Sequence, residues 1–334
     1  MGKIKKRGIF FTFIAITTMA VFILIFAPSA DVSLQKDVQS VRIRINSVDS
    51  YVSDLEDRYF ETILRATAYK AILSMVHYIN STGSYIQGID SAFYEISLNG
   101  TINGFPIDSV TGKKIMENNT IKNWTDRIAQ TSSDTLNVNT TIIVTNMTVS
   151  QNKPWVIDSS LTLQFAVKSN VAEWKDENLT ITTTISVEGF HDPYYIINTN
   201  RAYANKLKRS SIPFDQWNIS KVREHLRNGT YTENPKAPSF LMRLSNITSS
   251  SGCCGVESLV NPNKVGISDQ RESYVDYLFW THTYNPVGNC TQVYNITNPS
   301  TGSGLWDEFR YFKLDIDHVV GYNITSQDAV KNCG

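Results

Sequence analysis

The densest group of side chains that could do chemistry lies near the end of the chain, where Asp315, Asp317 and His318 fall within four residues. Two carboxylates and an imidazole can hold a cation or orient a proton transfer when partners from elsewhere in the chain converge on them. Their alternation with apolar Leu314 and Ile316 suits an exposed polar face equally well. The sequence leaves both interpretations open.

Other candidate groups have structural explanations. The tripeptide His191–Pro193 follows a predicted strand, and we expect a tight turn whose imidazole satisfies a backbone group. Tyr194, Tyr195 and Trp280 could form a ligand platform, although core packing accounts for them as well. The sequence contains no GxSxG, Walker, GxGxxG or HExxH motif. We therefore predict no enzyme, no catalytic or metal-binding residue, and no cofactor.

All four cysteines lie in the distal part of the chain, at Cys253, Cys254, Cys290 and Cys333. They form no CxxC pair, and the nearby histidines lack zinc-finger spacing, so a metal site is not expected. Because adjacent cysteines bridge each other only with strain, we expect two disulfides that join residues 253 and 254, in either order, to 290 and 333. Free buried thiols are the alternative.

The chain is rich in N-glycosylation sequons, N-x-S/T with x other than Pro. They begin at Asn80, Asn99, Asn118, Asn123, Asn139, Asn146, Asn178, Asn218, Asn228, Asn246, Asn289, Asn295 and Asn323. Their density predicts a glycosylated surface outside the cytoplasm. None lies in residues 31–79, which fits a segment that is packed or close to a membrane.

The N-terminus predicts the compartment. The apolar segment Ile9–Ala27 contains no charged residue and follows Lys3, Lys5, Lys6 and Arg7. Its length suits a transmembrane helix, and the cations before it place the N-terminus in the cytoplasm and the body outside. We therefore predict a single-pass protein of the cell membrane, in contact with lipid. The alternative is a signal peptide cleaved near residue 30.

The charge distribution argues against one class of partner. The chain has 31 basic and 31 acidic residues, and four of the basic ones lie in residues 1–8. The remainder has 27 basic against 31 acidic residues. Such a body lacks the clustered Lys and Arg of nucleic-acid-binding proteins, so no nucleic acid partner is predicted.

Residues 28–80 are predicted to form a long amphipathic stalk helix. An apolar stripe with alternating steps of four and three residues, typical of a coiled-coil seam, runs along its first half. The stripe consists of Leu34, Val38, Val41, Ile45, Val48, Val52, Leu55 and Tyr59. Beyond Tyr59 the apolar face widens, which indicates burial against a domain. We expect the first half to meet other helices in a homo-oligomer; the alternative is that the whole stripe packs on its own chain.

The remainder is predicted to be an α+β extracytoplasmic head. Residues 81–200 form its β-rich part, and residues 201–334 its mixed α/β part with the disulfides. Alternating apolar residues in 161–167 and 179–187 indicate an antiparallel pair with one solvated face, to which 140–149 adds a third strand. Capping and proline signals predict short helices over 121–129, 218–227 and 238–244.

The segment Lys5-Lys6-Arg7-Gly8, followed at once by the apolar run and a long helix, resembles the N-terminus of archaeal type IV pilin-like surface proteins with a class III signal peptide. The resemblance implies cleavage after Gly8, which makes Ile9 the mature N-terminus, and assembly of subunits through the N-terminal helix. Many type IV pilins carry an acidic residue five places into the mature helix, where this chain has Phe13. The size of the body favours a minor or adhesive subunit.

Three functional hypotheses follow. The first is a membrane-anchored or pilin-like cell-surface glycoprotein with a structural, assembly or adhesion role. The second is a single-pass ligand-binding ectodomain that serves a membrane partner, which an aromatic-lined cavity with converging polar groups would favour. The third is an exoenzyme, which would require Asp315, Asp317 or His318 to meet other acids in a cleft.

Overall fold

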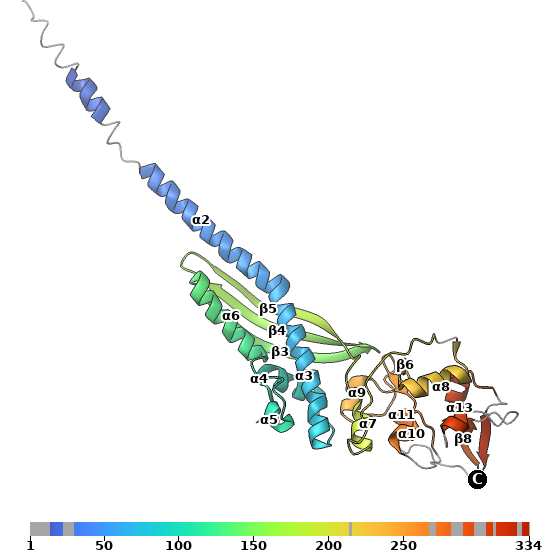
Figure 1. Ribbon diagram of the computed structural model, residues 1–334. Coiled ribbons are helices and arrows are strands. Elements are labelled where there is room, and N and C mark those ends of the chain that lie inside the picture. Colours follow the sequence, from blue (N-terminus) through green and yellow to red (C-terminus); the bar gives the residue numbers. More distant parts are fainter. Residues whose placement is uncertain are drawn as a thin grey trace, which may run out of the picture.

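The computed structural model describes residues 14–22, 30–213, 216–266, 272–281, 290–296, 305–309, 312–325 and 329–333. These residues form an α+β protein with antiparallel sheets, so this part of the fold prediction holds. Two parts lie side by side: a long three-stranded sheet with its helices, and a distal part of short helices and small sheets (Figure 1). The candidate site lies in the distal part.

The predicted membrane-spanning segment requires a correction. Within the described ranges, no helix is long and apolar enough to cross a membrane. Of the predicted span over 9–27, residues 14–22 are helical, and the two ends lie outside the described residues. This finding contradicts the single-pass transmembrane helix.

The predicted stalk over 28–80 is also wrong, because the residues after 29 do not form one uninterrupted stalk helix. Helix α2 (Ala30–Asp54) ends at a π-helical segment, η1 (Leu55–Tyr59), and α3 (Phe60–Thr82) follows it to a left-handed cap at Gly83. Helix α3 lies inside the body, with eleven buried residues. Its wide apolar face is covered by the chain's own sheet, and the rings of Phe60 and Phe165 lie 5.8 Å apart.

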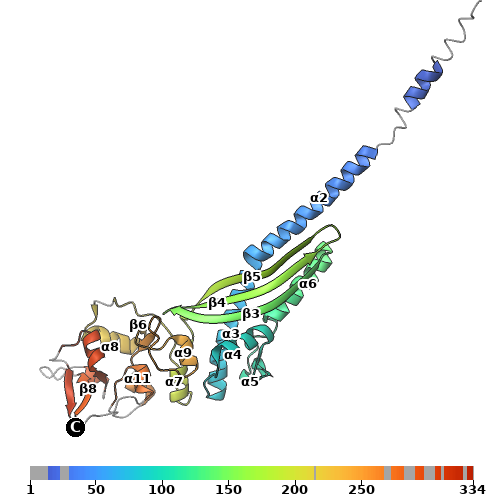
Figure 2. The ribbon, with the colours of Figure 1, turned by 180° about the vertical axis from the view of Figure 1, so that it is seen from behind.

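Helix α2 contacts the body toward its C-terminal end. Trp174 Nε1 donates a hydrogen bond to the Asp49 carboxylate at 3.3 Å, and Val48 and Val52 are buried. Toward its N-terminus the helix extends beyond the end of the sheet, as both ribbon views show (Figures 1 and 2). The apolar stripe therefore runs from a covered part of the chain onto a projecting part.

The main sheet has the order β3-β4-β5 and is antiparallel throughout. Its strands are β3 (Asn139–Lys153), β4 (Val156–Lys168) and β5 (Glu173–Ser186). Buried residues alternate with exposed ones, which confirms the predicted strands with one solvated face. A register shift between Val144 and Asn146 moves the buried positions of β3 from even to odd numbers, because a bulge inserts one residue.

Helices close the other face of this sheet. Helix α6 (Ile121–Leu136) lies along β3 and is longer than predicted. It begins at a capping box in which the Thr120 hydroxyl accepts the Asn123 N–H, and it ends at Asn137. The remaining elements before it are α4 (Ile89–Asn99), β1 (Thr101–Ile102), β2 (Phe105–Pro106) and α5 (Ile107–Thr111).

The distal part contains short elements connected by loops. Helix α8 (Ile219–Asn228) begins at the Asn218 cap and ends at Gly229, as predicted. Helix α9 (Phe240–Leu244) begins two residues later than predicted, with Ser239 as its cap. The other helices are α7 (Pro193–Asn198), α10 (Pro262–Val265), α11 (Asp276–Phe279), α12 (Leu305–Glu308) and α13 (Ile316–Gly321). The strands are β6 (Tyr231–Glu233), β7 (Val256–Ser258), β8 (Cys290–Ile296), β9 (Lys313–Asp315) and β10 (Ala329–Cys333).

Candidate functional site

Strand β7 separates two buried polar networks in the distal part. All three of its residues are buried, and it pairs with β6 so that Glu257 lies opposite Thr232. Successive side chains of a strand point to opposite faces. Glu257 therefore joins one network, and its neighbour Ser258 joins the other.

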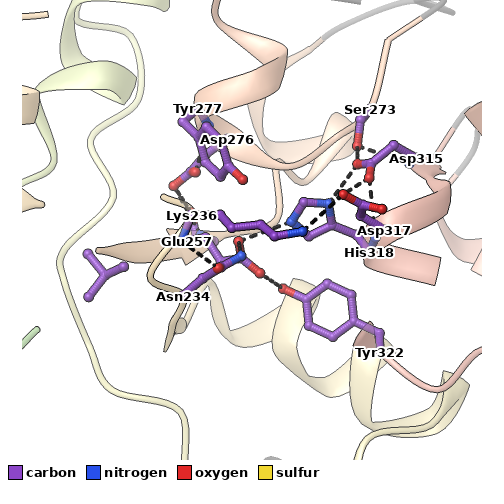
Figure 3. A network of polar contacts seen from close by, with 12 residues as sticks. Asn234, Lys236, Glu257, Ser273, Asp276, Tyr277, Asp315, Asp317, His318 and Tyr322 are labelled. Carbon is purple, nitrogen blue, oxygen red and sulfur yellow. Dashed lines mark hydrogen bonds and ion pairs between the residues drawn. The ribbon is translucent and has the colours of Figure 1, made fainter. Parts of the chain in front are cut away.

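The first network surrounds the Glu257 carboxylate, which is 3 % exposed. Its Oε2 accepts hydrogen bonds from His318 Nε2 at 3.1 Å and from Asn234 Nδ2 at 2.5 Å. Its Oε1 accepts a hydrogen bond from the Tyr322 hydroxyl at 2.7 Å. Figure 3 shows these donors arranged around the carboxylate. The three donors fix its position although it lies inside the protein.

His318 lies between two carboxylates. Its Nδ1 is 2.7 Å from Asp315 Oδ2, on the side opposite to Glu257. Asp315 is the N-cap of α13 and accepts the backbone N–H of His318 at 3.2 Å and the Ser273 hydroxyl at 2.6 Å. A capping aspartate three residues before a histidine brings the two side chains together within the first turn of the helix. Both ring nitrogens thus donate to carboxylates.

These contacts determine the charge of each group. Burial disfavours the imidazolium, but the charge of Glu257 and the hydrogen bonds to Asp315 and Glu257 outweigh burial and raise the pKa of His318 to about 10. Burial acts to raise the pKa of Glu257 and of Asp315, yet the contacts with His318 lower both. At neutral pH the network therefore consists of one cation and two anions.

Glu257 and His318 line a cavity of about 410 Å³. Trp217 and Tyr322 also line it, and their rings pack edge to face with 4.7 Å between centroids. At the exposed edge Lys236 Nζ lies 3.2 Å from Asp317 Oδ2. Figure 3 shows the Lys236 side chain running past the imidazole toward Asp317. The cavity thus combines aromatic walls, a fixed carboxylate and an ion pair at its edge.

The second network lies on the other face of β7, around the fully buried Arg243. Its Nη1 lies 2.6 Å from Asp192 Oδ2 and 2.9 Å from Asp276 Oδ2. The Ser258 hydroxyl donates to Asp276 at 2.8 Å, and the Tyr231 hydroxyl donates to Asp192 at 2.9 Å. Burial raises the pKa of Asp276; Arg243 opposes this shift and Asp192 adds to it. This network does not line the cavity and holds α7, α9 and α11 to β7.

The structure brings together part of the predicted cluster. Asp315 and His318 meet, whereas Asp317 points to the edge of the cavity and is exposed. Sequence reasoning missed Glu257 and Asn234, which complete the network. They lie far from the predicted cluster in sequence, and no local spacing connects them to it.

The other predicted candidates are structural. Asp192 caps α7 and binds Arg243, while His191 forms an isolated β-bridge with Lys206. Burial lowers the pKa of His191. Tyr194 and Tyr195 are buried, and Tyr195 packs edge to face on Trp280 with 5.7 Å between centroids. These aromatics belong to the core and do not line the cavity described above.

The cysteines pair differently from the expectation. A disulfide joins Cys253 to Cys254, so neither bridges to Cys290 or Cys333. The backbones of Cys290 and Cys333 are opposite one another in the register of β8 and β10. The adjacent pair lies before β7, and Cys254 contacts the Gln151 carbonyl near the end of β3. The two pairs thus belong to different elements, which sequence spacing does not reveal.

Most sequons lie on the surface. Ten of the thirteen sequon asparagines are exposed, Asn123 and Asn295 are half-buried, and Asn289 lies outside the described residues. The exposed ones leave their amide groups accessible for modification, and their use stays a prediction. The proposed processing position at Gly8 and Ile9 also lies outside the described residues.

Comparisons with known proteins identify no relative: no family model, curated protein or solved structure matches the chain. Within the described ranges, no group of three or more His, Cys, Asp or Glu side chains is arranged to hold a metal ion. Both ring nitrogens of His318 already contact carboxylates, at 3.1 Å and 2.7 Å, so neither is open to a substrate as a general base.

Proposed function

We propose that this chain is a surface assembly subunit whose projecting helix α2 packs against the same helix of a second copy. One observation carries this proposal. Val48, Val52 and Leu55 of the apolar stripe are buried at 2 %, 6 % and 2 % exposure, whereas Val38 and Val41 are exposed at 66 % and 40 %. A single stripe thus continues from a covered region onto an uncovered one.

A second copy is the occupant that best fits this surface. The steps of four and three residues keep the stripe on one side of a helix, which suits knobs-into-holes packing against another helix. The partner helix in a homo-oligomer carries the same stripe and is therefore complementary to it. The pilin-like N-terminal motif supports the same arrangement.

The location outside the cytoplasm is part of the proposal. Disulfides persist in oxidising compartments, and the structure contains the Cys253–Cys254 bridge. Sequons are used only outside the cytoplasm, and ten of their asparagines are exposed. Mass spectrometry of the mature chain tests whether the N-terminus is processed. A start at Ile9 supports prepilin-type processing, and an intact Met1 contradicts it.

Sedimentation velocity of the full-length chain over a range of concentrations tests the assembly. Val38→Asp places a charge in the stripe and should shift the chain to monomer. Ile43→Asp is the matched control, because Ile43 is an aliphatic residue of the same helix, 60 % exposed and on the opposite face. A wild-type chain that stays monomeric, or equal effects of the two variants, would contradict the proposal.

Ligand binding in the distal part is a second candidate function. The cavity provides the aromatic walls and converging polar groups that such a function needs, and its volume of about 410 Å³ is in the usual range for small-molecule sites. Calorimetric titration with small aromatic probes tests it. This function is compatible with assembly through α2, because the two use separate surfaces.

A further inference from the structure

We propose that the cavity beside Glu257 binds a small organic cation, namely a protonated amine that carries an apolar group. The inference rests on the second candidate function, ligand binding in the distal part, and adds the chemical class of the ligand. In the bound state the ammonium N–H donates to the Glu257 carboxylate, and the apolar group contacts Trp217 and Tyr322.

The first argument is the charge balance of the buried network. Within the described part of the chain, the printed ion pairs of Glu257 and Asp315 involve one cation, His318, which lies 3.1 Å from Glu257 and 2.7 Å from Asp315. Among these three side chains, one negative charge therefore has no cation of its own. An unpaired charge inside a protein is costly unless a counter-charge or hydrogen bonds stabilise it. A cationic ligand would supply that counter-charge.

The other carboxylates around the cavity already have cations. Asp317 pairs with Lys236 at 3.2 Å, and Glu233 pairs with Arg209 at 3.4 Å. Both pairs are largely exposed, and each is neutral as a whole. The surplus negative charge near the cavity thus remains with the buried network rather than with its edge.

The second argument is the free acceptor capacity of that network. Asp315 accepts the Ser273 hydroxyl, the His318 backbone N–H and His318 Nδ1, which reaches both of its oxygens. Glu257 accepts three hydrogen bonds within the described part of the chain, from His318, Asn234 and Tyr322. A carboxylate has about four acceptor sites. Glu257 also lines the cavity, whereas Asp315 does not, so the remaining acceptor site belongs to Glu257.

The third argument is the aromatic wall. Trp217 and Tyr322 belong to different segments, yet both line the cavity next to the carboxylate. The faces of aromatic rings attract cations, and tryptophan does so most strongly. Pro235 adds an apolar surface to the same cavity. Carboxylate, indole, phenol and proline together favour an ammonium group attached to an apolar body.

Two other ligand classes fit less well. A metal ion would find few ligands, because no group of three or more His, Cys, Asp or Glu side chains in the described part of the chain is arranged to hold one, and both His318 nitrogens already contact carboxylates. An anion would approach a site with surplus negative charge, which costs free energy. Lys236 is the one lining side chain in the described structure whose ammonium can compete with a ligand amine, since its Nζ already lies at the edge of the cavity.

Isothermal titration calorimetry of the full-length chain tests the inference with three probes: benzylamine, benzyl alcohol and methyl glucoside. Benzylamine should bind about tenfold tighter than benzyl alcohol, because its hydrogen bond to Glu257 is charge-assisted. If benzyl alcohol or methyl glucoside binds as tightly as benzylamine, the cavity binds ligands but the cation class is overturned. If none of the three binds, both the cation class and the second candidate function are overturned.

Two variants locate the binding. Lys236→Met removes the competing ammonium from an exposed position and should tighten benzylamine binding. Glu257→Gln should abolish the preference for benzylamine over benzyl alcohol, and a thermal melt verifies that the variant is folded. Glu188→Gln removes an exposed carboxylate elsewhere and serves as control. Unchanged benzylamine affinity in Lys236→Met together with a retained preference in Glu257→Gln would overturn the assignment.

Discussion

His318 Nε2 lies 3.1 Å from Glu257 Oε2, although the two residues are 61 positions apart in the chain. The contact joins β7 to α13, and Asp315 completes it from the other side of the imidazole. Removal of one member of such a group leaves the others buried with an altered charge, which costs more than removal of an exposed pair. The fold of the distal part therefore depends on these three side chains together.

A double-mutant cycle measures this dependence. His318→Gln leaves two buried carboxylates without a cation, and we expect it to lower the free energy of unfolding by about 3–5 kcal/mol. Glu257→Gln leaves a balanced pair and should cost about 1–3 kcal/mol. The double variant should lose less than the two single losses together, with a coupling of roughly 0.5–3 kcal/mol. Urea denaturation of the four proteins provides the values, and strictly additive losses would contradict the network.

The stability of the chain should fall on the alkaline side because of His318. The groups that face this imidazole are Glu257, Asp315 and the rings of Tyr277 and Tyr322. Its pKa is raised from 6.5 to about 10 on folding. A raised pKa stabilises fully below the unfolded value, and the stabilisation is lost as the pH rises toward the folded value. Urea midpoints measured from about pH 6 to about pH 10 should fall in the wild type and fall less in His318→Gln.

His225 should act in the opposite direction. It is fully buried, its Nδ1 lies 2.6 Å from the Thr230 hydroxyl, and burial lowers its pKa from 6.5 to about 4. A lowered histidine pKa means that stability is lost as the pH falls from about 6.5 to about 4. His225→Gln should therefore flatten the acid side of the profile. The flattening is partial, because Glu257 and Asp315, with lowered pKa values, also lose their stabilisation in acid.

The elements that could be predicted from the sequence are those with a local pattern. The alternation in β4 and β5 and the Asn218 and Gly229 signals of α8 depend on neighbouring residues, and the structure confirms them. The lengths of the connections between elements were less predictable. The connection between β4 and β5 has four residues, 169–172, where the alternation suggested about ten.

Long-range features could not be predicted in this way. The Asp315 and His318 pair has a local origin in the cap of α13, whereas Glu257 joins it only through the folding of β7 against that helix. The uninterrupted stalk was wrong for another reason. The apolar stripe continues through the π-helical segment Leu55–Tyr59, so the residue pattern does not indicate the interruption there. The widening of the apolar face beyond Tyr59 did indicate burial against a domain, and the sheet covers α3.

The buried Arg243 provides a fourth prediction. Arg243→Met leaves Asp192 and Asp276 inside the protein without their cation, and we expect a loss of at least about 3–5 kcal/mol. Adding Asp276→Asn to this variant should restore part of the loss, because one unpaired charge is removed. Arg65→Met is the control, since the Arg65 side chain is 62 % exposed in its pair with Glu61 and should cost less than about 1 kcal/mol. Chemical denaturation measures the free energy of unfolding of the three variants. Equal losses for Arg243→Met and Arg65→Met would contradict the role of Arg243 as the cation of the buried network.

Gly255 links the backbone around the disulfide to the wall of the cavity. A Cβ at this position would collide with the carbonyl oxygens of Asn234 and Ala237, at the loop that supplies Asn234 to Glu257. Gly255→Ala must push these two backbone segments apart, and we expect a loss of about 1–3 kcal/mol. The loss should come with changed chemical shifts of the Asn234 amide group, measured by NMR.

Gly321→Ala is the matched control for this substitution. A Cβ on Gly321 meets no atom within 4 Å, and this residue also lines the cavity. Alanine favours the helix in which Gly321 lies, so the variant should stay within about 0.5 kcal/mol of the wild type or gain stability. Because both glycines lie close to the cavity, a difference between the two variants isolates the close backbone approach at Gly255. Equal stabilities would mean that the loop of Asn234 yields to a methyl group, and that its hydrogen bond to Glu257 does not depend on Gly255.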